Sequence, residues 1–233
     1  MIIMYYYGID PTYILCIIGM ILCIAASSHV KITFKKFSRI RSYCGMTGAE
    51  AASKILSQNG FYDVSVNHIK GDLTDHYDPR TQSVNLSDSV YGSTSIAAIA
   101  VAAHECGHVA QNHTDYVPLK LRTALVPAAN IGSQIGLPLV IIGLIFSSGS
   151  FLITLGIWIF SLSVIFQIVT LPVEFNASSR ALQTLEEYGI LGGDENSSAK
   201  KVLTAAALTY VAAAASSALQ LLRLVLLSNR RRD

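Results

Sequence analysis

Two histidines and one glutamate of this sequence have the spacing of a metal site. His104, Glu105 and His108 form the pattern His-Glu-x-x-His. Residues four apart lie on the same face of an α-helix, so both imidazoles can bind one ion at Zn–N distances of about 2.0–2.1 Å. Glu105 lies one step further round the helix, where it can face an activated water without binding the metal. The pattern predicts a zinc site in which Glu105 is the general base.

The residues before this pattern indicate that its helix is buried. Residues 98–103 are all apolar and lead directly into His104. Burial of ionisable side chains is unfavourable unless they have a partner, and a divalent cation provides one. The alternative is that His104 and His108 are ordinary core or surface histidines and that Glu105 forms a surface pair. The spacing favours the metal site over this alternative.

A zinc site that activates water needs a third protein ligand and a position for solvent. The metzincin pattern would place a histidine at Thr114 and a glycine at Gln111, so His113 is one residue away and is expected to be a surface residue. Glu174 is the better candidate, because it is the first charged residue after the uncharged residues 123–173. An ordinary carboxylate at a membrane interface is the alternative interpretation of Glu174.

The composition predicts membrane helices around this site. Charged residues make up 14% of the 233 residues and apolar residues 52%, with a mean hydropathy of +0.46. A soluble domain carries about 25% charged residues, so an ordinary cytosolic domain, a disordered chain and a collagen-like repeat are excluded. Residues 123–173 would form about 75 Å of helix. That length allows two crossings, at 125–146 and 151–173, joined by a turn at 147–150.

Two further uncharged stretches are candidates for membrane helices. Residues 11–30 are followed by a basic cluster, whereas a signal peptide would begin with basic residues. By the positive-inside rule the N-terminus is expected outside, with an aromatic belt at residues 5–7, and the next part of the chain in the cytoplasm. Residues 202–222 are a weaker candidate, because arginines follow them. The basic cluster consists of Lys31, Lys35, Lys36, Arg39 and Arg41.

These stretches divide the chain into predicted segments. Residues 1–28 form a transmembrane anchor, 29–123 a cytoplasmic part with the metal-binding helix, and 124–173 a transmembrane hairpin. Residues 174–201 carry the third ligand and a connector, and 202–233 form a C-terminal helix that could also cross the membrane. The cysteines show no C-x-x-C spacing, so no disulfide framework is expected. The net charge of +2 does not indicate a nucleic-acid partner.

Capping signals predict two helices in the water-facing part. Thr47 and Glu50 match a capping box, in which each side chain binds the other residue's backbone amide. The helix that starts there is expected to end near residues 59–60, where Asn and Gly form a stop signal. Ser93 or Thr94 is expected to cap the long helix that carries the metal-binding pattern.

Between these helices the sequence predicts a small β-hairpin. Strands are expected around residues 64–69 and 83–87, where apolar residues alternate with polar ones. Asp75 and Asp78 are expected to form turns ahead of Pro79.

Four stretches of the sequence carry a resemblance to a known family. They are Gly-Met-Thr-Gly-Ala at 45–49, Leu-Thr-Asp-His-Tyr-Asp-Pro at 73–79, Ala-Ala-His-Glu-Cys-Gly-His at 102–108, and residues 171–180. Through them the chain resembles, nearly from end to end, the YugP-type membrane zinc metallopeptidases of bacteria. More distantly, it is similar to the HtpX and CAAX prenyl protease group.

The resemblance implies roles for further residues. Glu174 would be the third zinc ligand, on a helix opposite the one that carries the two histidines. Ser178 stands where the HtpX and CAAX group has an aspartate. The resemblance therefore leaves open which residue orients His104 or His108. The resemblance also implies that the strand at 83–86 is the sheet edge to which an extended substrate adds.

Together these features predict a mainly α-helical, membrane-anchored, gluzincin-like zinc metalloendopeptidase with a small β-hairpin and three or four transmembrane helices. One zinc ion per chain would be bound by His104, His108 and Glu174, and Glu105 would be the catalytic base.

The expected partners are the lipid bilayer and a protein or peptide substrate at the membrane, without nucleic acid. We expect a multi-pass cell-membrane protein with its metal site on the cytoplasmic side. Arg180 and His76 are candidates for stabilising an oxyanion, with ordinary surface and loop roles as the alternative. The alternative function is a non-catalytic membrane protein in which zinc is structural or sensory. The sequence does not indicate the oligomeric state.

Overall fold

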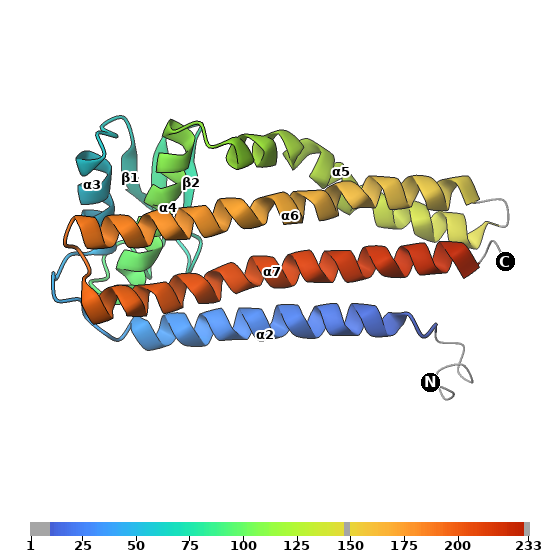
Figure 1. Cartoon of the computed structure of the whole chain (residues 1–233), viewed down its shortest axis with the longest axis horizontal. Helices are drawn as coiled ribbons and strands as arrows, with labels where there is room; N and C mark the ends of the chain where they lie inside the picture. Colours follow the sequence, from blue (N-terminus) through green and yellow to red (C-terminus); the bar gives the residue numbers. More distant parts are fainter. Residues whose placement is uncertain (1–9, 147–149, 231–233) are drawn as a thin grey trace. The chain divides into compact units, whose positions relative to one another are not determined.

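The computed structural model describes residues 10–146 and 150–230, and the protein is mainly helical (Figure 1). The predicted aromatic belt at residues 5–7 and most of the predicted turn at 147–150 lie outside the described residues. The elements follow the order α2 (Tyr13–Phe37), α3 (Gly48–Gln58), β1 (Ser65–His68), β2 (His76–Asp78), β3 (Ser83–Leu86), α4 (Ile96–His113), α5 (Val117–Ile145), α6 (Ser150–Glu187) and α7 (Gly193–Arg230).

The chain divides into two compact units. One, which we call the helical unit, comprises the described residues within Met1–Ser27, Lys120–Leu171 and Thr209–Asp233. The other, the site unit, comprises Ser28–Leu119 and Pro172–Leu208. The small sheet, α3 and α4 belong to the site unit, and α2, α5, α6 and α7 each contribute residues to both units.

Within the described residues, four helices are long and apolar enough to cross a membrane: α2, α5, α6 from Phe151 and α7 as far as Asn229. Only 6% of the most apolar window of α2 is buried in the protein. So much exposed hydrocarbon is unfavourable in water, so these helices indicate membrane association. The fourth candidate, α7, includes the stretch at 202–222 for which the sequence left the membrane assignment open.

Small residues allow α5 and α6 to pack closely in the helical unit. A Cβ atom at Gly136 would lie 2.8 Å from the backbone nitrogen of Phe160, and one at Gly156 would lie 2.7 Å from the carbonyl oxygen of Gly136. Backbones can approach this closely only where side chains are absent, a common arrangement of helices in membranes. The two sides of the predicted hairpin are therefore packed against each other.

The predicted capping box at the start of α3 is confirmed. The backbone amide of Glu50 donates to the Thr47 hydroxyl at 3.2 Å, and the amide of Thr47 donates to the Glu50 carboxylate at 2.8 Å. The helix ends at Gln58, Asn59 is its C-cap, and Gly60 follows with a φ of +75°. The predicted cap of α4 at Ser93 or Thr94 is wrong, because the cap is Ser95, whose hydroxyl accepts from the amide of Ala98.

The small sheet differs from the predicted hairpin. The described sheet has the order β1-β3-β2, and the two predicted strands, now β1 and β3, are parallel neighbours. The antiparallel partner of β3 is β2, which the sequence analysis read as turn. Asp78 does form the predicted turn by accepting from the amide of Arg80. Asp75 does not, because its carboxylate binds the amide and hydroxyl of Ser87 after β3.

Helix α6 is continuous through residue 174. It begins at Ser150 and ends at Glu187, so the predicted segment boundary at 173/174 falls inside one helix that contains Pro172. Proline removes one backbone hydrogen bond but does not end this helix. Likewise α2 continues past residue 28 to Phe37. The basic residues after the first apolar stretch therefore lie partly on the membrane helix itself.

Candidate metal centre

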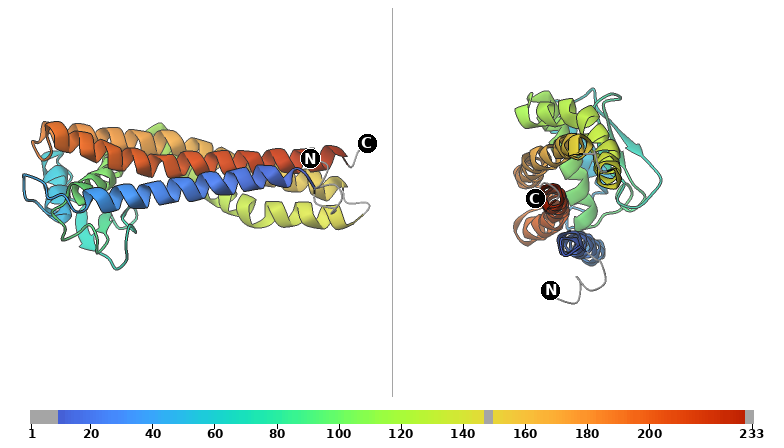
Figure 2. Two further views of the ribbon diagram at one scale, coloured as in Figure 1. Left: turned by 90° about the horizontal axis from the view of Figure 1, so that it is seen from below. Right: turned by 90° about the vertical axis from the view of Figure 1, so that its right-hand side faces the viewer.

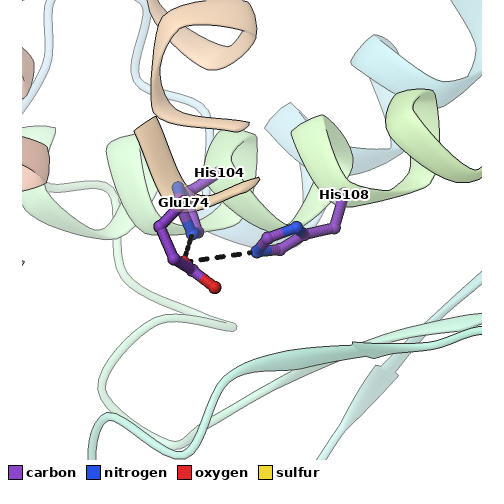
Figure 3. Close-up of side chains that lie close together, drawn as sticks. All are labelled: His104, His108 and Glu174. Carbon is purple, nitrogen blue, oxygen red and sulfur yellow. Dashed lines mark ion pairs between the residues drawn. The ribbon is translucent and has the colours of Figure 1, made fainter. Parts of the chain in front are cut away.

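Three side chains from two helices meet in the site unit. His104 and His108 lie one turn apart on α4, and Glu174 lies on α6 (Figure 3). Glu174 Oε2 lies 3.3 Å from His104 Nε2 and 3.6 Å from His108 Nε2. One ligand atom from each residue lies within 4.8 Å of the others. The structure thus brings together the three residues that the sequence analysis proposed as metal ligands.

The separations fit a single tetrahedral ion. Ligand atoms at about 2.0–2.1 Å from zinc in a tetrahedral shell are about 3.3–3.4 Å apart. Two of the three separations, 3.3 Å and 3.6 Å, are close to that value, and all three ligand atoms lie within 4.8 Å of one another. Two imidazole nitrogens and one carboxylate oxygen are also a donor set that zinc commonly takes in hydrolases. The residues present therefore fit a zinc ion.

Both imidazoles have a hydrogen-bond partner on the side away from Glu174. His104 Nδ1 lies 3.1 Å from the Ser178 hydroxyl, and His108 Nδ1 lies 3.0 Å from Gln111 Oε1. The Gln111 carbonyl oxygen can only accept, so His108 Nδ1 carries the proton and its Nε2 is left as the metal-binding atom. Ser178 thus provides the contact that the sequence left open for His104.

Gln111 contacts the cluster and was missed by the sequence analysis. Its side chain is fully buried, and its amide nitrogen donates to the carbonyl oxygen of Val173 at 2.7 Å and to Asn176 Oδ1 at 3.0 Å. One side chain therefore joins His108 to the turn of α6 that carries Glu174. Its position three residues after His108 on a helix is the signal that could have revealed it.

The two ligand-bearing helices touch backbone to backbone. Gly107 on α4 faces α6, where a Cβ atom at residue 107 would lie 2.5 Å from the carbonyl oxygen of Ala177. Both residues are buried. The glycine of the His-Glu-Cys-Gly-His sequence thus allows α6 to approach closely enough for Glu174 to reach the imidazoles.

The electrostatics of the site favour binding of a cation. Glu174 is 2% exposed, and placing a carboxylate there is unfavourable without positive partners. Burial by itself would lower the pKa of His108, but its contact with the Glu174 carboxylate and the nearby charge of Glu105 outweigh that effect and raise the pKa above its usual value. The site therefore attracts positive charge, which a proton or a metal ion can supply.

Glu105 and Cys106, the two residues that follow His104, face different surroundings. Glu105 is 7% exposed and close enough to His108 to affect its pKa. Cys106 is turned toward α3, where its thiol lies 3.7 Å from the carbonyl oxygen of Ala52, and burial raises the pKa of that thiol. Cys106 is therefore a core residue, and all four cysteines are free thiols.

The other candidates lie outside the three-residue cluster. Arg180 donates to Asn176 Oδ1 at 2.9 Å and to the Thr114 hydroxyl at 3.3 Å, so its guanidinium connects α6 to the end of α4. His76 is exposed, and its Nδ1 lies 3.0 Å from the carbonyl oxygen of Thr74. His113 stacks on Phe61 with ring centroids 4.3 Å apart.

The strand at 83–86 is not a sheet edge. It is β3, the central strand of the described sheet, and it pairs with β1 on one side and β2 on the other. Its backbone groups are therefore engaged on both sides, and the expectation that substrate adds to this strand is wrong. The sequence analysis missed β2, which covers the side of β3 that was expected to be open.

Comparisons with known proteins place the chain among putative zinc metallopeptidases. A family model described as "Putative neutral zinc metallopeptidase" matches residues 12–229. The "Putative membrane protease YugP" of Bacillus subtilis (strain 168) is 47% identical over 208 residues, which cover 89% of this chain and 92% of that relative. No solved structure matches the chain.

Proposed function

This chain belongs to the zinc metallopeptidase family whose model matches residues 12–229, and from that membership we propose that it is a membrane-embedded, gluzincin-like zinc endopeptidase. The observation that carries the proposal is the meeting of His104, His108 and Glu174 around one point. Three protein ligands are the usual number in a hydrolytic zinc site, because the remaining position takes water or substrate. We propose one zinc ion per chain, bound by these residues.

The reaction would combine the metal with a protein base. Zinc, when bound, would lower the pKa of water and polarise the carbonyl group of the scissile peptide. Glu105 would accept a proton from the attacking water on its carboxylate and pass it to the leaving amine. Ser178 and Gln111 would hold the two imidazoles in the correct orientation through their Nδ1 atoms.

The position of Glu174 in the chain supports the proposal that the substrate lies at the membrane. Glu174 directly follows the apolar part of α6, so the chain itself connects the site to membrane helices. We propose that the enzyme cuts membrane proteins or membrane-proximal peptides. The basic residues at the end of α2, among them Lys35 and Lys36, support a cell-membrane protein with its site on the cytoplasmic side.

The alternative function is a non-catalytic membrane protein that holds zinc for structure or sensing. A structural zinc normally has four protein ligands, often cysteines. In the part of the chain that the structure describes, the candidate cluster holds three residues, and Cys106 points toward α3 instead. These features favour the hydrolase.

The decisive experiment separates zinc binding from proteolysis. The Glu105→Gln variant in detergent should retain one zinc per chain but cleave casein about 10²–10⁴-fold more slowly, because only the proton acceptor is lost. A chelator should abolish wild-type cleavage, and added zinc should restore it. Glu187→Gln, at an exposed position of α6, is the matched control and should remain active. Full activity of Glu105→Gln would reject the mechanism.

A further inference from the structure

A second feature of the site unit is a pocket of about 460 Å³ between α2 and α7. It is lined by residues within 29–37 of α2 and within 197–205 of α7, and we call it the basic pocket. These two helices run side by side in Figures 1 and 2. None of its lining residues belongs to the metal centre, so it has no part in the proposed reaction.

Three lysines line the basic pocket without a counter-charge. Lys36 comes from α2, and Lys200 and Lys201 come from α7. No carboxylate lines the pocket, and none of these lysines forms an ion pair with a described residue. The acidic Glu195 on the same helix is already engaged, because it accepts from the amide of Tyr43 at 2.8 Å. Like charges gathered in this way repel one another unless an anion lies between them.

Hydroxyl groups and a buried apolar wall complete the pocket. Thr33 on α2 and Ser197 and Thr204 on α7 line it, and hydroxyls can donate to the oxygens of an anion. Phe37 and Ala205, at 5% and 1% exposure, form its apolar wall. Ammonium and hydroxyl donors beside hydrocarbon suit a ligand that has a charged head and an apolar body.

The pocket lies where both helices pass from apolar to charged sequence. On α2 it covers residues 29–37, where the uncharged stretch at 11–30 ends and the lysines begin, and on α7 it ends within the start of the apolar stretch at 202–222. Both helices are long and apolar enough to cross a membrane. This boundary is the level at which lipid phosphates lie, and basic pockets between membrane helices bind such groups.

We propose that the basic pocket binds the phosphate-bearing headgroup of an anionic phospholipid. Lys36, Lys200 and Lys201 would contact the phosphate oxygens, and the hydroxyls would donate further hydrogen bonds. A free phosphate ion shares this chemistry but would not use the apolar wall. The proposal commits to the lipid, and the experiment distinguishes the two sources.

The test uses the full-length protein in a neutral detergent. Added dioleoylphosphatidylglycerol should raise the thermal unfolding temperature and remain bound in native mass spectrometry, whereas dioleoylphosphatidylcholine should do neither. The triple variant Lys36→Gln, Lys200→Gln, Lys201→Gln should bind phosphatidylglycerol about a hundredfold more weakly, at about fivefold for each lysine. The single variant Lys200→Gln should show about a fivefold loss if the triple variant does not fold.

A matched control separates the pocket from general attraction between opposite charges. The control is a second triple variant, in which three lysines that do not line the pocket are replaced: Lys31→Gln, Lys35→Gln and Lys70→Gln. It loses the same number of charges and should bind the lipid nearly as well as the wild type. Equal weakening in both triple variants would overturn the proposal. So would inorganic phosphate that stabilises the protein as strongly as the lipid does, because the pocket would then bind the ion alone.

Discussion

A Cβ atom at Gly107 would lie 2.5 Å from the carbonyl oxygen of Ala177, so the backbones of α4 and α6 are in contact at this point. The contact lies beside the two histidines of α4 and the glutamate of α6 that form the cluster. Real Cβ atoms do not approach an oxygen this closely. Any side chain at residue 107 would therefore move α6 away from α4, and Glu174 would move with it.

Gly107→Ala should accordingly weaken both the fold and the metal site. Overpacking of this kind destabilises proteins by about 1–3 kcal/mol, although alanine by itself favours a helix more than glycine does. We expect a lower unfolding temperature and weaker zinc binding in a chelator competition titration. Gly92→Ala is the control, because a Cβ atom there meets nothing within 4 Å. Unchanged zinc affinity in Gly107→Ala would show that the contact does not position Glu174.

Glu174→Gln should lose zinc. The amide has the same shape as the carboxylate but lacks its charge, so the fold should survive while the oxygen ligand becomes far weaker. We expect zinc affinity to fall by more than about a hundredfold. This loss is larger than the loss of affinity expected when only a hydrogen bond that orients a ligand is removed. Elemental analysis after dialysis measures the change, with Glu187→Gln as the control. If one zinc per chain remains, the third ligand lies elsewhere.

Gln111→Leu should weaken zinc binding without removing a ligand. Leucine cannot accept from His108 Nδ1, so the ring would be free to rotate, and zinc affinity should fall about 10–100-fold. The variant should also be about 1–3 kcal/mol less stable, because the buried carbonyl oxygen of Val173 loses its donor. Gln183→Leu, at an exposed position of α6, is the control. Equal zinc affinity in the two variants would contradict the orienting role.

Removal of the metal should lower the stability of the wild-type protein. A ligand that binds only the folded state at a thousand times its dissociation constant stabilises that state by about 4 kcal/mol. A chelator should therefore lower the unfolding temperature, and excess zinc should restore it. The unfolding temperature of Glu174→Gln should not respond to the chelator. A wild-type temperature that is insensitive to zinc would show that the cluster does not bind it tightly.

Local sequence signals were sufficient for the features that depend on neighbouring residues. The helical spacing of His104 and His108 places both rings on one face wherever that helix lies, because the helical repeat alone decides it. The capping box of Thr47 and Glu50 is confirmed for the same reason, since both partners lie within one turn. The uncharged stretches likewise indicate membrane helices through length and composition alone.

The tertiary structure decided every feature that depends on residues far apart in the chain. Parallel pairing of β1 with β3 depends on the path of the chain between them. The alternation of apolar and polar residues cannot reveal the direction of pairing, because it is the same for parallel and antiparallel partners. The link from Gln111 to Val173 spans 62 residues and has no local signature. Likewise the short spacing between Glu174 and the imidazoles exists only because Gly107 and Ala177 pack in contact, which is a property of two helices and not of either one.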